Sequence, residues 1–255
     1  MTTIAVSSLT FFSGFGLGTL LLPVFLLFFP VNTAIAATAI VHLANNIFKA
    51  LLIGGKANLK VVAFFSLPAA CTAVLGALLL EKLGELPPLY HYELLGRLLS
   101  ISPINLIVAV LMAGFAYLEL NPRFQELSFP PKWLPAGGAL SGFFGGLSGH
   151  QGALRSAFLA RLNLTKEEFI GSNVISAIAV DVARLIVYGM TFFSKDLQAL
   201  LAKDQAGLII CGILSALLGA VAGARLIKKI TMRAIQRLIG NLLVIYAVLL
   251  GLGII

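Results

Sequence analysis

The sequence predicts an all-α polytopic membrane protein with about eight transmembrane helices. Of its 255 residues, 59% are hydrophobic and only 11% are charged, whereas a typical soluble protein has about 25% charged residues. The apolar residues also occur in runs of about 18 or more, which is the length that crosses a hydrocarbon core of about 30 Å. A soluble fold of this length would expose large apolar patches, so the composition excludes an ordinary soluble domain.

The apolar stretches are separated by short polar connections and define the expected helices. They lie at about 4–29, 35–54, 61–80, 103–120, 134–160, 169–193, 205–225 and 235–255. No basic residue precedes the first stretch and no small-residue cleavage site follows it. We therefore expect a retained span there and not a signal peptide.

Residues 83–100 depart from this pattern because Pro87 and Pro88 interrupt the chain. Four leucines that follow share one helical face: Leu94, Leu95, Leu98 and Leu99. We expect a short amphipathic helix at the membrane interface, with two tyrosine rings at headgroup depth.

Internal similarity predicts two homologous four-span halves. Residues 13–20 resemble 141–148, and residues 74–83 resemble 217–226. The first half comprises residues 1–120, with the interfacial segment 83–100, and the second comprises residues 134–255 after a connecting loop at 121–133. Many transporters consist of such repeats and bind substrate near mid-membrane between them. Four full crossings in each half would make the repeats parallel, whereas a re-entrant hairpin in each would make them inverted.

The basic residues predict the orientation of the chain. Alternate loops contain nine and six Lys or Arg residues, mostly because of the cluster from Arg225 to Arg237. The positive-inside rule then places the N-terminus outside. Since the other basic residues are scattered between apolar runs, the formal charge of +8 indicates contact with lipid headgroups and not with nucleic acid. Cys71 and Cys211 lie inside apolar runs, which argues against a disulfide framework.

Two glycine-rich stretches allow either close helix packing or a broken helix. The first contains Gly14, Gly16 and Gly18, and the second contains Gly145, Gly146, Gly149 and Gly152. Small residues four apart let helices approach closely, whereas a break would direct backbone N–H groups at an anion. Packing is favoured for the first stretch. A break is favoured for the second, because polar side chains follow it immediately.

Polar side chains inside the apolar spans are the strongest indication of function, because a charge at mid-bilayer costs about 2.5–3.5 kcal/mol even on the mildest scale. Spacings of three and four place those of the second span on one helical face. We expect a substrate site between the two halves that is lined by seven of these residues: His42, Asn46, Lys49, His150, Gln151, Arg155 and Asn173.

Several of these residues have alternative interpretations. Asp181 and Arg184 lie one helical turn apart and can form a structural ion pair. As the one acid well inside an expected span, Asp181 is also a candidate proton carrier, which makes protons a candidate coupling ion. Lys49 can instead snorkel from a helix end to water, and His150 can be a hydrogen-bonded packing residue. Arg155 has no acid within one turn, so its guanidinium needs a partner from another helix or from a ligand.

The balance of charges indicates an anionic substrate. Lys49, Arg155 and Arg184 outnumber Asp181, and arginine binds oxyanions through bidentate hydrogen bonds. No acidic cluster suits a cation pump, and no Cys/His spacing suits zinc, haem or an iron–sulfur cluster. We therefore expect no metal and no other cofactor.

The alternative to a transporter is an intramembrane enzyme or a non-transporting scaffold. His150 with Ser148 or Ser156 offers a base and a nucleophile. No nearby carboxylate is identifiable that would orient the histidine, so the sequence favours a transporter and predicts no catalytic residue.

At these residues the sequence resembles the sulfite exporter TauE/SafE family of multi-pass anion permeases. The resemblance rests on Gly16-Leu-Gly-Thr-Leu-Leu-Leu-Pro23, on Ala36-Ala-Thr-Ala39, on the run from Gly142 to Leu159, and on Asp181, Arg184 and Tyr188. It covers nearly the whole chain. The resemblance implies transport of sulfur oxyanions such as sulfite, or of organosulfonates, across the cytoplasmic membrane of a prokaryote, by a monomer or an oligomer. The chain departs from the plainer family pattern at Gly14-Phe-Gly-Leu-Gly18 and Gly149-His-Gln-Gly152, so the resemblance does not specify the substrate.

Overall fold

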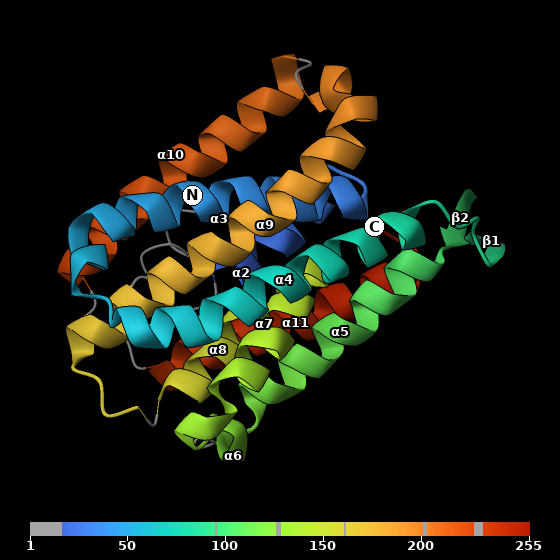
Figure 1. Ribbon diagram of the computed structural model, residues 1–255. Helices are drawn as coiled ribbons and strands as arrows, with labels where there is room; N and C mark the ends of the chain where they lie inside the picture. The colour runs from blue at the N-terminus through green and yellow to red at the C-terminus, as the bar shows by residue number, and fades with distance from the viewer. Residues whose placement is uncertain (1–16, 95, 126–128, 161, 201–202, 227–231) are drawn as a thin grey trace.

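The computed structural model describes residues 17–94, 96–125, 129–160, 162–200, 203–226 and 232–255. It is a bundle of helices with one β-hairpin at an end (Figure 1). The helices are α2 (Leu17–Leu26), α3 (Val31–Ile53), α4 (Leu59–Gly84), α5 (Pro103–Leu120), α6 (Pro122–Gln125), α7 (Leu134–Ser148), α8 (Gly152–Leu159), α9 (Lys166–Leu200), α10 (Lys203–Leu226) and α11 (Met232–Gly251). Two single 3₁₀ turns, η1 (Gly54–Lys56) and η2 (Pro131–Trp133), precede α4 and α7.

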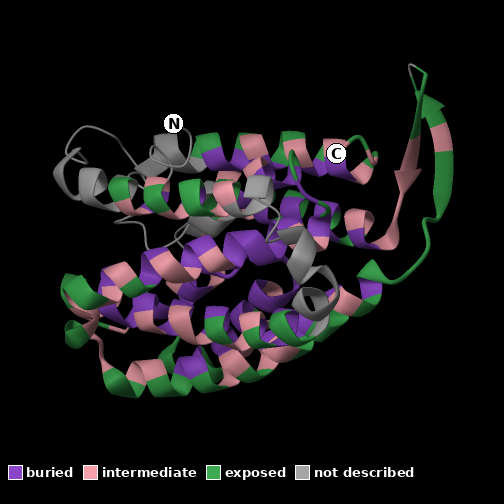
Figure 2. Cartoon of the chain, turned by 90° about the horizontal axis from the view of Figure 1, so that it is seen from above, coloured by how far each residue is buried: buried purple, intermediate pink, exposed green. Residues whose placement is uncertain are grey.

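Length and composition identify the chain as a mostly helical multi-pass membrane protein. Four helical segments among the described residues are long and apolar enough to cross a membrane: Val31–Lys56, Leu59–Gly84, Pro103–Leu120 and Lys166–Met190. Gly207–Leu218 and Arg237–Gly251 are shorter apolar helices. Buried residues concentrate inside the bundle (Figure 2). Many large apolar residues are exposed, as lipid contact requires. Eight crossings and a two-half repeat stay predictions.

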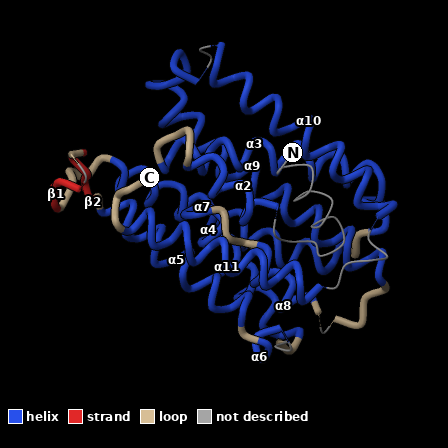
Figure 3. Tube along the Cα trace, turned by 180° about the vertical axis from the view of Figure 1, so that it is seen from behind, coloured by secondary structure: helices blue, strands red, loops and turns tan. Residues whose placement is uncertain are grey.

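The expected interfacial helix within residues 83–100 is wrong. β1 (Tyr90–Leu94) and β2 (Arg97–Ile101) form an antiparallel hairpin instead. The strands connect through Gly96, which has a φ of 73°, a conformation that glycine adopts without the steric cost of a Cβ. The turn at Gly96 therefore produces a hairpin where the spacing of the leucines predicted a helix. The hairpin extends from one end of the bundle beside the C-terminus (Figures 1 and 3), where the Tyr92 hydroxyl donates to the Leu252 carbonyl.

Side-chain caps define where several helices begin. Asn58 accepts a hydrogen bond from the Val61 N–H at the start of α4, and Ser102 does the same for Asn105 before α5. Such caps satisfy amides that have no partner inside the helix. The α9 helix begins with a reciprocal pair in which Thr165 and Glu168 each accept the other's backbone N–H, as in a capping box.

Close packing of α4 against α7 depends on three glycines that lie one turn apart on α7. A Cβ at Gly138, Gly142 or Gly146 would lie 2.2, 2.0 or 2.1 Å from a carbonyl oxygen of α4. The corresponding α4 residues are Phe65, Ala69 and Ala73. The two backbones therefore touch along this stripe, which is how small residues bring membrane helices together.

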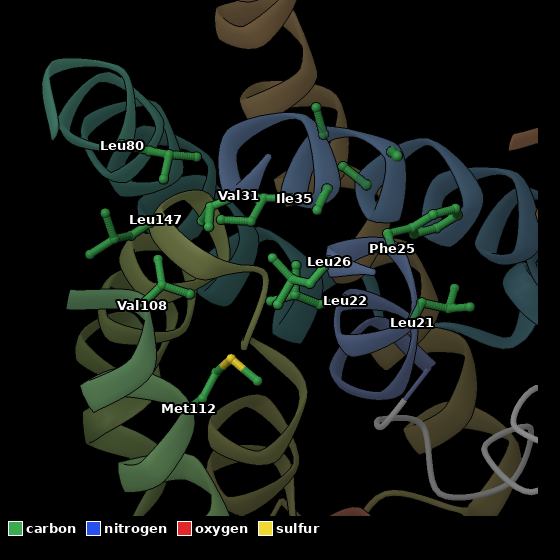
Figure 4. Close-up of a cluster of buried hydrophobic side chains, with 14 of the residues drawn as sticks. Leu21, Leu22, Phe25, Leu26, Val31, Ile35, Leu80, Val108, Met112 and Leu147 are labelled. Atoms are coloured by element: carbon green, nitrogen blue, oxygen red, sulfur yellow. The ribbon is translucent and has the colours of Figure 1, made fainter. Parts of the chain in front are cut away.

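An apolar core holds the first helices against this pair. In the close-up, Leu22 and Leu26 of α2 lie beside Ile35 of α3 and near Met112 of α5 (Figure 4). Leu147, close to the end of α7, belongs to the same core. These contacts position the end of α7, where the polar site begins.

Candidate functional site

A break between α7 and α8 places two polar side chains in the interior. Gly149 ends α7 with a φ of 80°, and its N–H donates to the Gly145 carbonyl. Because α8 begins at Gly152, His150 and Gln151 lie in the connection. The Ser141 hydroxyl donates to the backbone carbonyl of Gln151 at 2.8 Å and so holds the connection against α7. The second glycine-rich stretch thus contains both a helix break and close packing.

In the first glycine-rich stretch, Gly14 and Gly16 lie outside the described residues, and Gly18 lies in α2.

Asp181 of α9 is the centre of a buried hydrogen-bond network. Its Oδ1 accepts from Arg184 through Nε at 3.1 Å and Nη2 at 2.7 Å, and from Gln151 Nε2 at 3.1 Å. Its Oδ2 lies 2.6 Å from His42 Nδ1 and accepts from Asn46 Nδ2 at 3.4 Å. His42 and Asn46 come from α3, so the network joins three separate parts of the chain. The spacing of Asp181 and Arg184 predicted their contact, but not the contact with His42.

Arg155 has its partners on α9 and in the connection before α8. Its Nε donates to Asn173 Oδ1 at 2.9 Å, and its Nη1 donates to Gln151 Oε1 at 2.9 Å. Only 1% of the Arg155 surface is exposed. Gln151 therefore bridges the Arg155 guanidinium to the Asp181 carboxylate. The partner that the sequence required for Arg155 from elsewhere is thus provided by two amide side chains.

Arg184 also ties α9 to the end of α7. Its Nη1 donates to the Gly145 carbonyl at 3.0 Å, and the Tyr188 hydroxyl donates to the Gly146 carbonyl. Carbonyls in the last turn of a helix lack partners within the helix, and a cation there is favoured by the helix dipole. Arg184 therefore neutralises Asp181 and stabilises the broken helix at once.

Lys49 is the third polar residue that α3 contributes to the site, after His42 and Asn46. It is 5% exposed, so its side chain is buried and does not snorkel to water. It lies close enough to Arg155 for their charges to interact. Two cations therefore lie near one another at one side of the network.

His150 faces a different helix. Its ring stacks on Phe115 of α5 with centroids 5.1 Å apart, and its Nδ1 lies 3.2 Å from Ser148 Oγ. Since Ser148 donates its own proton to the Phe144 carbonyl, it accepts from His150. The serine is therefore not activated by this histidine, which does not support the nucleophile of the enzyme alternative. The other ring nitrogen, Nε2, is buried without a hydrogen-bond partner among the described residues.

Glu119 and Thr38 are among the buried polar residues that the sequence pattern did not identify. Glu119 of α5 is 5% exposed, so Asp181 is not the one buried acid. Thr38 is 1% exposed and lies one turn before His42 on α3. The four-residue spacing from Thr38 to His42 could have identified the threonine. No group of three or more His, Cys, Asp or Glu side chains within the described ranges is arranged to hold a metal ion.

Comparison with protein-family models matches residues 1–250 to the model described as sulfite exporter TauE/SafE. Neither the curated proteins nor the solved structures contain a match to the chain. The matched residues include every side chain of the buried network.

Proposed function

The chain belongs to the sulfite exporter TauE/SafE family, and we propose that it is a secondary transporter for a small sulfur oxyanion, either sulfite or an organosulfonate. The family is one of membrane transporters for sulfur compounds. The proposed substrate site is the buried network with its neighbours, formed by His42, Asn46, Lys49, Gln151, Arg155 and Asn173, with His150 at its α5 side. Asp181 and Arg184 support this site as a charged pair.

The charge of the network carries this proposal. Lys49, Arg155 and Arg184 are three buried cations, and Asp181 is the one buried acid among the described residues of the same three helices. The other buried acid of the described residues, Glu119, belongs to α5. Formal charges therefore leave an excess of two positive charges. Because uncompensated charge inside a protein or membrane is costly, a bound anion stabilises this arrangement.

Arg155 is the proposed anchor for the substrate. Two of its acceptors, the Gln151 and Asn173 amide oxygens, are neutral. Hydrogen bonds from a guanidinium to a charged oxyanion are roughly twice as strong as neutral ones, and two parallel N–H groups fit two oxygens of one substrate. The α8 helix begins one residue after Gln151, so the positive end of its dipole also favours an anion at the break.

The packing of α3 against α9 supports a site between the two proposed halves. Each corresponds to the second expected span of its half, and together they contribute His42, Lys49, Asn173 and Asp181. We place the protein in the cytoplasmic membrane of a prokaryote, as the family resemblance implies. The distribution of Lys and Arg supports an N-terminus on the outside. Accessibility of single cysteines at either terminus to an impermeant reagent tests this orientation.

Flux in proteoliposomes tests the function. Purified protein is reconstituted and preloaded with unlabelled sulfite or isethionate, and counterflow of the same anion labelled with ³⁵S is measured. We expect uptake above that of protein-free liposomes, and competition by anions of the accepted class. The matched variants are Arg155→Gln, which removes the buried guanidinium, and Arg97→Gln, which changes an exposed arginine of β2. The first variant loses uptake and the second retains it. Folded, monodisperse protein that moves neither anion would refute the proposal.

A further inference from the structure

We propose that Nε2 of His42 binds a proton that is carried together with the substrate anion, so that the transporter is a proton–anion symporter. This inference rests on the proposed function and adds the coupling ion and the atom that binds it.

Asp181 cannot hold the proton because both of its oxygens are occupied by donors. Arg184 donates twice to Oδ1, and Gln151 donates once to the same atom. Arginine remains protonated in proteins, so three donors at one oxygen, two of them from a cation, strongly favour the ionised carboxylate. Asn46 adds a fourth donor, at Oδ2. A proton on either oxygen would displace one of these bonds in a fully buried position.

The contact at 2.6 Å between Asp181 Oδ2 and His42 Nδ1 then determines the state of the imidazole. An ionised carboxylate only accepts hydrogen bonds, so the hydrogen lies on Nδ1. In the neutral ring the lone pair is therefore on Nε2. An acidic partner at Nδ1 also stabilises the imidazolium. The proton step is the addition of one H⁺ to Nε2 of a neutral imidazole, which gives an imidazolium and breaks no covalent bond.

The surroundings of Nε2 leave room for this proton. Among the described residues, Nε2 contacts Asn46 Nδ2 at 3.4 Å, which is long for a hydrogen bond. Thr38 lies one turn earlier on the same face of α3, and its Oγ1 is buried without a hydrogen-bond partner within the described part of the chain. A hydroxyl accepts as well as donates, so this face contains an unused acceptor for a protonated ring.

The groups around His42 link its charge to the anion. Asp181 and Arg184 face it from α9, and Arg155 acts on it from α8. Lys49 lies further along α3 itself. On the other packed elements, α2 has no titratable side chain, none of the ionisable side chains of α4 is buried, Lys56 of η1 is exposed, and Cys211 of α10 is exposed.

Protonation of His42 changes the formal charge of the His42–Asp181 pair from −1 to zero. The excess of positive charge in the whole network therefore rises by one. The added positive charge favours the anion, and the anion favours the proton by the same factor. Gln151 connects the two positions, because it contacts Asp181 and Arg155 at once. Anion and proton therefore bind together and leave together, which is the condition for symport.

Proton movement in proteoliposomes provides the first test. The lumen contains a pH-sensitive dye, the membrane potential is clamped with potassium and valinomycin, and a gradient of sulfite drives transport. The signal is compared with that of His42→Gln protein at equal labelled flux, because sulfite that has entered exchanges protons with water whether or not a proton was carried with it. We expect the lumen to acidify as labelled sulfite enters. Labelled flux without acidification would overturn the symport while leaving the proposed function intact, whereas absence of labelled flux would overturn the proposed function.

His42→Gln separates coupling from anion binding. Because His42 also lines the proposed site, we expect weaker counterflow, which needs no net proton movement, and complete loss of the acidification that accompanies each labelled anion. Its apparent affinity for sulfite loses a pH dependence that reaches up to about tenfold per pH unit in the wild type, the limit for one linked proton. His91→Gln, on exposed β1, is the matched control and keeps both. Acidification that persists in folded His42→Gln protein would show that another group carries the proton.

A spectroscopic measurement covers the case in which His42→Gln does not fold. The chain has three histidines, so removing His91 or His150 assigns the remaining ¹⁵N signals of labelled protein without changing His42. We expect Nε2 of His42 to become protonated as the pH falls, and bound sulfite to move the midpoint to higher pH. A His42 signal whose midpoint is unchanged by sulfite would overturn the inference.

Discussion

Replacing Gly142 by alanine separates two helices that touch through their backbones. The new Cβ would lie 2.0 Å from the Ala69 carbonyl oxygen and 2.6 Å from its Cα. Ordinary van der Waals contact begins near 3.4 Å, so α4 and α7 must move apart by about 1.4 Å. No rotamer change relieves the clash, because the opposing atoms are backbone. Gly138 and Gly146 make equally close approaches one turn away on either side, so the helix cannot tilt out of the contact.

Overpacking a close-packed interior costs about 1–3 kcal/mol and sometimes more. Since this clash involves backbone along three helical turns, we expect Gly142→Ala to destabilise the protein by about 3 kcal/mol or more. The assay is thermal unfolding in detergent, followed by the fluorescence of Trp133 and by loss of monodispersity.

Gly114→Ala on α5 is the matched control. A Cβ there meets nothing within 4 Å, and alanine is favoured over glycine in a helix by about 0.5–1 kcal/mol. Gly142→Ala and Gly114→Ala therefore move the midpoint in opposite directions. An unchanged or raised midpoint for Gly142→Ala would refute direct backbone contact between α4 and α7.

Three further changes probe the site. Arg155→Lys keeps the charge but loses the planar arrangement of donors. We expect counterflow to fall at least about tenfold, since one charged hydrogen bond contributes about 1.5–3 kcal/mol. Equal flux in this variant and in the exposed control Arg97→Lys would contradict the proposed anchor. Gly149→Ala forces a side chain onto a φ of 80° at a cost of about 1–2 kcal/mol, and we expect a lower thermal midpoint than for Gly189→Ala, where a Cβ meets open space. Asp181→Asn leaves buried cations uncompensated, so we expect a loss of about 3–5 kcal/mol in stability; a midpoint equal to that of wild type would show that the carboxylate charge is dispensable.

The positions of the helices follow closely from hydropathy, because only a helix or a closed barrel satisfies its backbone in lipid. Expected stretches such as 103–120 and 205–225 correspond to α5 and α10. The hairpin after α4 could not be predicted from the leucine spacing, since one glycine in a left-handed conformation reverses the chain. A short segment outside the hydrocarbon core is free of the constraint that makes the helices predictable.

The composition of the site could be predicted more completely than its connections. Charged residues inside apolar spans must be buried, and a spacing of three pairs Asp181 with Arg184 on one helix. By contrast, Asp181 and His42 are 139 residues apart, and their contact depends on how α3 packs on α9. As the one acid recognised in the spans, Asp181 looked like the proton carrier. The donors at its oxygens favour the ionised carboxylate, which holds His42 in one tautomer. The proposed proton-binding residue is therefore His42 and not Asp181. The role of a buried charge therefore depends on its number of donors, and spacing along a chain contains no information on donors from another helix.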